Sequence, residues 1–117
     1  MSVESQAILA GHVPVKRIAS LLEAEVSGKI LVRDMQRPQY KIIEFQTPEG
    51  SWSTLHVFLD SWAADDYASV YKGPSTFVTA EFNTQNYNLV RSLAAAIGGL
   101  VRRTEGEPWV ELEPVRY

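Results

Sequence analysis

His56 is the side chain best suited to acid–base chemistry, because an imidazole titrates near neutral pH and this one falls in a predicted strand, Trp52–Asp60. If that strand pairs with the predicted strand Ser75–Phe82, His56 approaches Thr79 or Glu81 on the same face. Glu81 could then orient or charge the imidazole. The sequence thus predicts a pocket of His56, Thr79 and Glu81 in a small enzyme or ligand-binding domain. The alternative interpretation is that His56 is an ordinary surface residue.

A second group of notable residues lies between two predicted strands, in the stretch from Ser61 to Gly73. Connections of this length are often functional, and Trp and Tyr bury large areas at low entropic cost. We therefore expect an acidic and aromatic surface here that contacts another protein or a second copy of the chain. The alternative is a short amphipathic helix that packs its aromatic side chains onto the core. The candidate residues are Trp62, Asp65, Asp66, Tyr67 and Tyr71.

Metal and cofactor sites are not indicated. The chain has no cysteine, and neither of its two histidines, His12 and His56, has a further ligand at the spacing of a zinc site. The carboxylates of Asp60, Asp65 and Asp66 lack the alternating oxygens and the central glycine of a calcium loop. We expect no metal and no cofactor, and the missing catalytic constellation favours a non-enzymatic protein.

The distribution of charge argues against nucleic acid and membranes as partners. The net charge is -3, and all of it arises from Leu59 onward, where eight acidic residues face five basic ones. Nucleic acid requires a basic face, and the cluster Arg91, Arg102 and Arg103 is equally explained by stabilisation of a helix C-terminus. No apolar run approaches the roughly 20 residues of a membrane helix. With no signal-peptide pattern at the N-terminus and no cysteine, we expect a cytoplasmic location.

The first elements that must position these residues are a strand, a helix and a hairpin. The apolar run Gln6–Ala10 predicts the strand. Pro14 suits the first turn of the helix, and Gly28 predicts its end. Lys29–Asp34 and Tyr40–Gln46 are rich in β-forming residues and predict the hairpin.

The second half of the chain repeats this order. Ser75–Phe82 predicts a strand, and Asn83 or Thr84 predicts the cap of a helix that ends at Gly98–Gly99. A second hairpin follows. The side chains expected to be buried in the strand are Thr76, Val78, Ala80 and Phe82.

One architecture buries all the apolar faces. We predict an α+β domain, residues 1–117, with a largely antiparallel sheet and two helices packed on one of its faces. The 117 residues, 45% hydrophobic and 21% charged, suit a single soluble domain. The order of elements also fits two βαββ-like halves, although such units are common enough to overlay by chance.

In size and layout the chain resembles small α+β proteins found among bacterial accessory, phage-encoded and immunity-type proteins. That resemblance involves no motif, so it assigns no role to any residue. The most favoured hypothesis is a non-enzymatic interaction module that binds a partner or itself through the acidic and aromatic surface. The alternative hypothesis is a small enzyme or ligand-binding domain that uses His56 and Glu81.

Overall fold

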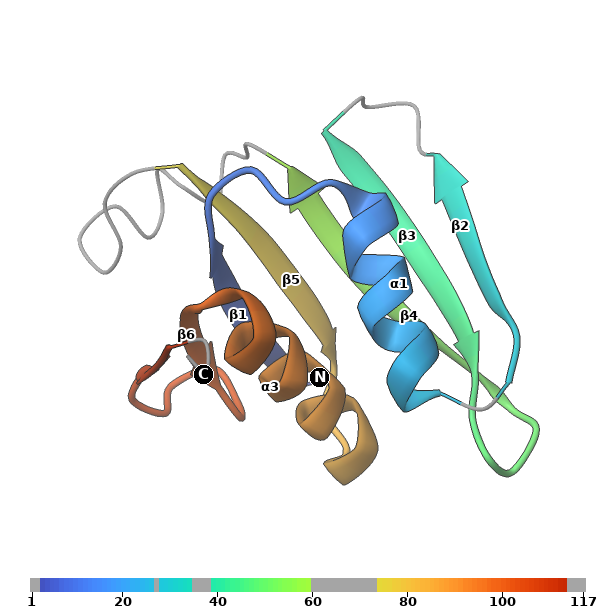
Figure 1. The fold of residues 1–117 in the computed structure, drawn as a ribbon. Helices are drawn as coiled ribbons and strands as arrows, with labels where there is room; N and C mark the ends of the chain where they lie inside the picture. Colours follow the sequence, from blue (N-terminus) through green and yellow to red (C-terminus); the bar gives the residue numbers. More distant parts are fainter. Residues whose placement is uncertain (1–2, 27, 35–38, 60–73, 114–117) are drawn as a thin grey trace.

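A seven-stranded antiparallel sheet and two helices make up the part of the molecule that the computed structural model describes, residues 3–26, 28–34, 39–59 and 74–113 (Figure 1). The predicted α+β class and the antiparallel sheet are confirmed. Neither described helix is long and apolar enough to cross a membrane. The elements are β1 (Glu4–Ala10), α1 (Val15–Glu25), β2 (Ile30–Asp34), β3 (Tyr40–Gln46), β4 (Trp52–Leu59), β5 (Ser75–Glu81), α3 (Thr84–Ile97), β6 (Gly99–Arg102) and β7 (Val110–Leu112).

The strands follow the order β2-β3-β4-β5-β1-β6-β7 across the sheet. β4 pairs with both β3 and β5, so it joins the early and the late parts of the chain. β1 lies between β5 and β6 and pairs with both. The two stretches that the sequence suggested as βαββ halves are therefore interleaved, and the structure does not confirm them as separate units.

The helix α1 begins as predicted and ends differently. Pro14 occupies the N-cap position, and Ile18 and Leu22 are buried. The helix ends at Glu25, and Val26 has an extended backbone at the C-cap. Gly28, where the sequence predicted the stop, is therefore not the residue at which the helix ends. A glycine is needed at position 28 for another reason. A Cβ there would lie 2.7 Å from the Cβ of Gln46, which is too close for two non-bonded carbon atoms.

The helix α3 has the predicted cap and the predicted stop. The side chain of Asn83 accepts a hydrogen bond from the backbone N–H of Asn86 at 2.8 Å, which satisfies one of the free donors of the first turn. Gly98 ends the helix with φ 96°, a conformation that favours glycine. The adjoining Gly99 permits β6 to approach β1, since a Cβ there would collide with the carbonyl oxygen of Ile8.

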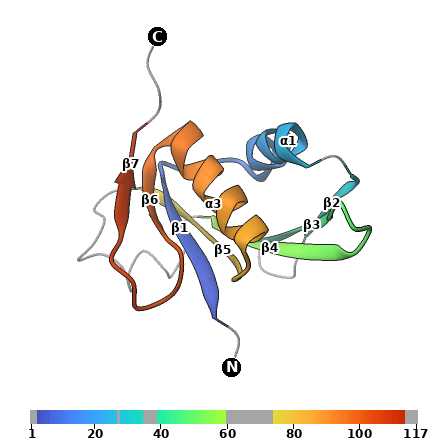
Figure 2. The same cartoon turned by 90° about the horizontal axis from the view of Figure 1, so that it is seen from below.

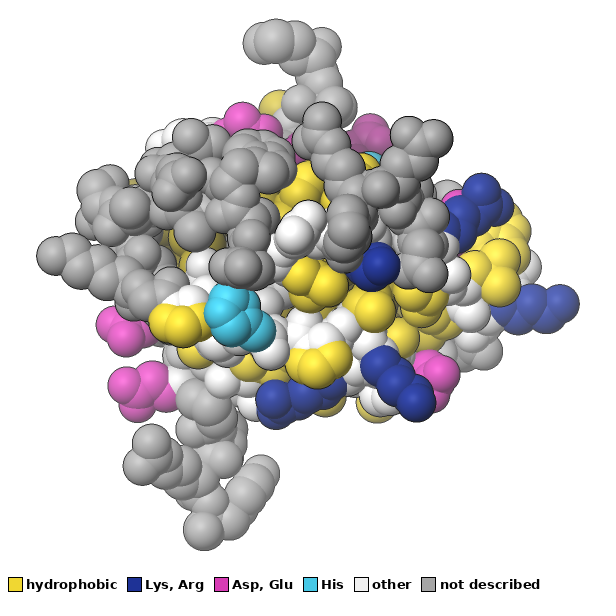
Figure 3. All heavy atoms as spheres, turned by 90° about the horizontal axis from the view of Figure 1, so that it is seen from above, with side chains coloured by type: hydrophobic (Ala, Val, Ile, Leu, Met, Phe, Trp, Pro, Cys, Tyr) yellow, Lys and Arg dark blue, Asp and Glu magenta, His cyan; other side chains and the backbone are white. Residues whose placement is uncertain are grey.

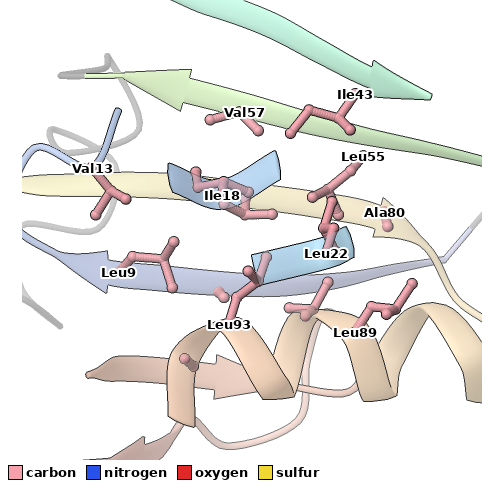
Figure 4. Packing of buried hydrophobic residues seen from close by; sticks show 14 of the residues in the cluster. Leu9, Val13, Ile18, Leu22, Ile43, Leu55, Val57, Ala80, Leu89 and Leu93 are labelled. Atoms are coloured by element: carbon pink, nitrogen blue, oxygen red, sulfur yellow. The ribbon is translucent and has the colours of Figure 1, made fainter. Parts of the chain in front are cut away.

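The main core lies between the sheet and the two helices. Figures 1 and 2 show α1 and α3 on the same side of the sheet. Side chains from both helices and from β1, β3, β4 and β5 meet there, as Figure 4 shows. Most of these side chains are aliphatic, and they exclude water from that face. The largest that are fully buried include Phe45, Leu9, Ile18, Leu22, Ile43, Leu55 and Leu93.

β5 is buried on both faces, which the alternation in its sequence did not predict. Thr76, Val78 and Ala80 are fully buried on the helix side, as expected. Phe82, expected with them, is 37% exposed because the strand ends before it. On the other face Phe77 and Thr79 are only 6% and 5% exposed. β5 lies between β4 and β1, and side chains of these neighbouring strands cover its distal side chains. The alternation of apolar and polar residues therefore underestimates the burial of β5.

Candidate functional site

The sheet face that points away from α1 and α3, here called the distal face, carries the polar residues singled out in the sequence. His56 of β4 lies opposite Thr79 of β5. Thr79 lies opposite Gln6 of β1, and Gln6 lies opposite Arg102 of β6. Side chains directly opposite in an antiparallel pair share a face and stand close enough to interact. A row of polar side chains therefore crosses four neighbouring strands.

The imidazole of His56 is held by Tyr40. The Nδ1 atom of His56 and the hydroxyl oxygen of Tyr40 are 2.5 Å apart, and the two rings are stacked with centroids 5.9 Å apart. Burial first, and then the carboxylate of Glu4, raise the pKa of Tyr40 above its ordinary value of 10. The phenol thus keeps its proton at neutral pH, and the tautomer of the imidazole decides which of the two groups donates the hydrogen bond. The hydrogen bond fixes the orientation of the His56 ring.

Thr79 is bound to a carboxylate that the sequence did not single out. Its hydroxyl donates a hydrogen bond of 2.8 Å to Oε2 of Glu4. Glu4 lies opposite Glu81 in the pairing of β1 with β5, so two carboxylates stand side by side next to Thr79. Within the described residues, the hydrogen bonds of His56 and Thr79 lead to Tyr40 and Glu4 rather than to each other.

Two adjoining hollows form around these side chains. One, of about 290 Å³, is lined by Glu4, Gln6, His56, Phe58, Phe77, Thr79 and Glu105. The other, of about 340 Å³, is lined by Glu4, Trp52, Ser53, Thr54, His56 and Glu81. Glu4 and His56 belong to both hollows. Three glutamates stand among these lining residues, and no lysine or arginine does.

Aromatic side chains form one margin of the hollows. The rings of Tyr40 and Phe58 are stacked with centroids 4.7 Å apart, and Phe58 contacts Phe77 at 5.9 Å. Phe77 and Ile8 form a second small cluster of buried hydrophobic residues. Contacts among aromatic rings of this kind stabilise a sheet face beyond the area that they bury. This margin is therefore an apolar support beside the polar row.

The row ends on β6 with a cation. The Nε atom of Arg102 donates a hydrogen bond of 2.7 Å to Gln6, and its guanidinium lies 4.4 Å from the ring centroid of Trp109. Arg102 is thus occupied by contacts within the protein, and a guanidinium over an indole is a favourable arrangement. The charge that the hollows present is set by their glutamates.

Sequence reasoning placed some of these residues and missed others. The pocket residues His56, Thr79 and Glu81 all lie on the distal face, around the two hollows. Glu4 was missed because the predicted first strand began at Gln6, although the alternation Glu4, Gln6, Ile8 against Ala7 and Leu9 indicates a longer strand. Tyr40 was missed, although the short turn Pro48-Glu49-Gly50 between its strand and that of His56 indicates that the two strands pair as a hairpin.

The acidic and aromatic connection lies outside the described residues. It comprises Trp62, Asp65, Asp66, Tyr67 and Tyr71. Among the residues that the structure does describe, no group of three side chains is arranged to hold a metal ion.

Comparison with known proteins gives no significant match. No family model, no curated protein and no solved structure matches this chain.

Proposed function

We propose that this chain is a non-enzymatic binding module whose distal face binds a positively charged group of a partner protein. One observation carries the proposal. Three glutamates, Glu4, Glu81 and Glu105, stand among the described residues that line the two adjoining hollows, and none of these lining residues is a lysine or an arginine. A hollow that presents charge of one sign attracts and holds the opposite charge.

The surroundings of the glutamates suit a lysine or arginine side chain. Trp52 lines the larger hollow and is 47% exposed, so its ring is accessible to a cation. Glu4 accepts one hydrogen bond from Thr79 through Oε2, and within the described residues its second carboxylate oxygen accepts none, so it can bind a ligand. Glu81 is exposed at the end of β5. An indole and two carboxylates around one hollow match the charge and the aliphatic stem of a basic side chain.

The residues Trp62, Asp65, Asp66, Tyr67 and Tyr71 have the same acidic and aromatic character, and we propose that they extend the contact with the partner. A module of this size and layout fits an accessory, phage-encoded or immunity-type role.

A second candidate function is a ligand-binding domain or small enzyme at the same hollows, using His56 and Glu81. The observation that favours it is the oriented imidazole of His56, which lines both hollows. The hydrogen bond from Thr79 to Glu4 counts against a His56–Thr79 nucleophile pair, because the base should accept the proton of the nucleophile.

A titration with an octalysine peptide, followed by NMR, tests the binding module. Octalysine should shift the indole N–H resonance of Trp52 and the ring resonances of His56, and octaglutamate should not. In the double variant Glu4→Gln, Glu81→Gln the dissociation constant for octalysine should rise at least about tenfold.

The matched control is the double variant Glu23→Gln, Glu25→Gln, which removes the same charge from the exposed side of α1. It should bind octalysine nearly as the parent does. Equal weakening in both double variants would mean attraction by net charge alone and would overturn the proposed site.

A further inference from the structure

The two edges of the sheet differ in their protection against pairing with another chain. β7 has three residues, with Glu111 at its centre and Glu113 just beyond its end. Short length and charged side chains are the usual devices that prevent an edge from recruiting a strand. β2 has five residues and the sequence Ile30-Leu31-Val32 at its start, with Leu31 47% and Val32 45% exposed. Among the described residues, β2 is thus the less protected edge, because it is longer and exposes the apolar side chains of Leu31 and Val32.

The backbone of β2 has hydrogen-bonding groups that point away from the sheet. The N–H of Gln46 donates to the carbonyl oxygen of Lys29, so this pair is a hydrogen-bonded pair of the β2–β3 ladder. Hydrogen-bonded and non-bonded pairs alternate in an antiparallel ladder, so the odd-numbered residues of β2 bond to β3. The N–H and C=O groups of Ile30 and Val32 therefore face the outer side of the strand. Among the described residues, no strand pairs with that side.

The exposed side chains of β2 lie on both faces of the sheet. Val32 lies opposite the buried Ile43 and so belongs to the helix side, whereas Leu31 lies opposite Glu44 on the distal face. In Figure 1 α1 lies in front of β3 and β4, and β2 continues beyond it. Figure 3 shows hydrophobic side chains between lysine and arginine side chains at the right-hand end of the molecule, where β2 lies. A strand added to this edge would cover apolar surface on both faces.

We propose that β2 pairs with β2 of a second copy of this chain, antiparallel and about a two-fold axis. In the register that we assign, Leu31 lies opposite Leu31 of the partner subunit, and Ile30 lies opposite Val32 of the partner subunit, twice by symmetry. Every apolar residue of the strand then meets an apolar one. The outward N–H and C=O groups of Ile30 and Val32 bond to each other across the axis. The two sheets become one continuous sheet.

The two neighbouring symmetric registers are less favourable. One would centre on Val32 and place Leu31 opposite Arg33, and the other would centre on Ile30 and place Leu31 opposite Lys29. In the assigned register Arg33 comes opposite Lys29 of the partner subunit. The ion pair of Arg33 with Glu44, at 2.7 Å, offsets that repulsion. Apolar matching thus selects the register.

The contact is small, so the dimer is reversible. Two five-residue strands cover less than the roughly 1,200 Å² of a typical stable interface. The dimer should therefore form at high protein concentration and dissociate on dilution. This proposal does not depend on the proposed function, because the hollows lie on a face of the sheet and β2 on its edge.

Sedimentation equilibrium from about 10 μM to about 1 mM protein tests the dimer. The parent chain should show a monomer–dimer equilibrium, and Val32→Lys should raise the dissociation constant at least about tenfold by placing two like charges in the contact. The matched control is Val110→Lys, which places the same charge on the 52% exposed valine of the opposite edge and should leave the equilibrium unchanged. A parent chain that stays monomeric throughout, or a dimer sensitive only to Val110→Lys, would overturn the proposal.

Cross-linking tests the register. Since the chain has no cysteine, Leu31→Cys introduces a single thiol at the proposed two-fold axis, in a non-bonded pair whose side chains stand close. Oxidation should cross-link Leu31→Cys faster than Val32→Cys, and both variants should keep the thermal unfolding midpoint of the parent within a few degrees. Faster cross-linking of Val32→Cys would contradict the assigned register.

Discussion

The two faces of the sheet are built from the same strands and differ in nearly every property. On β4, Leu55 and Val57 point toward the helices and are almost fully buried, whereas Thr54 and His56, which alternate with them, line the distal hollows. The helix side gains its stability from apolar contacts that any well-packed aliphatic set provides. The distal face holds specific polar pairs. The comparison indicates that apolar packing on the first face maintains the fold, whereas the second face carries the polar side chains on which the proposed function rests.

The distal face is nevertheless organised rather than simply solvated. Gln6 and Thr79 are each 5% exposed, and each has a hydrogen-bond partner, Arg102 and Glu4 respectively. Within the described residues no buried side-chain nitrogen or oxygen lacks a partner, as in well-formed proteins generally. Side chains held this way are pre-organised, which would lower the entropic cost of the binding that we propose.

The largest contrast between the faces is expected for neighbouring residues on β4. Leu55→Ala should lower the free energy of unfolding by about 2–5 kcal/mol, because it leaves a cavity in the helix-side core. Thr54→Ala, one residue away on the distal face, should lower it by less than about 1 kcal/mol. Urea denaturation of both variants measures the difference. Equal losses would mean that the distal face is as important to the fold as the core.

The same substitution on the two faces of β5 should give an intermediate contrast. Thr76 accepts a hydrogen bond from the N–H of Val13 at 2.8 Å and donates one to the carbonyl oxygen of Gly11 at 2.9 Å. Thr76→Val leaves both backbone groups unsatisfied and should cost about 1–3 kcal/mol. Thr79→Val frees only a carboxylate oxygen of Glu4 that water can reach, and should cost less than about 1 kcal/mol. Guanidinium denaturation curves compare the two, and the reverse order would contradict the contrast.

A third prediction concerns Tyr40 on the distal face, whose replacement is expected to cost less than Leu55→Ala or Thr76→Val. Tyr40→Phe removes the hydrogen bond to His56 and keeps the ring stacked on Phe58, so it should cost about 0.5–1.5 kcal/mol at neutral pH. Because the folded pKa of Tyr40 is raised, its stabilising contribution is present below pH 10 and is lost as the pH rises through the folded value.

An alkaline titration followed by phenolate absorbance measures the pKa of Tyr40 directly. Glu4→Gln should lower the pKa of Tyr40 toward 10, since the carboxylate of Glu4 is the second cause of the shift. Tyr40→Phe identifies which phenol titrates. An unchanged alkaline titration in Glu4→Gln would show that Glu4 does not raise the pKa of Tyr40. It would contradict an electrostatic interaction between β1 and β3 at the hollows.

Local patterns predicted the elements well, and they did so where one residue type has one physical role. Asn83 is a cap because its side chain accepts the N–H of the first turn, and Gly98 ends α3 because it adopts a positive φ. Gly28 resembled such a stop, but that prediction was wrong. Glycine is also required where two chain segments approach closely, as Gly28 does beside Gln46. Spacing along the chain does not distinguish the two uses.

The candidate site was predictable only in part. Alternation put His56 and Thr79 on one face, but the hydrogen bond of His56 goes to Tyr40, 16 residues away, and that of Thr79 goes to Glu4, 75 residues away. Such partners depend on which strands are neighbours. In this fold β1 lies between β5 and β6, and nothing local in the chain specifies that position.

The sequence by itself determined the α+β class and the antiparallel sheet. It also determined which side chains of each strand are apolar, because period and capping are local properties of the chain. Only the tertiary structure decided the strand order, the meeting of Glu4 with Thr79, and the exposure of β2 as an edge. Those features follow from long-range packing, in which contacts between distant segments are selected by the burial of the whole core rather than by any one stretch of residues.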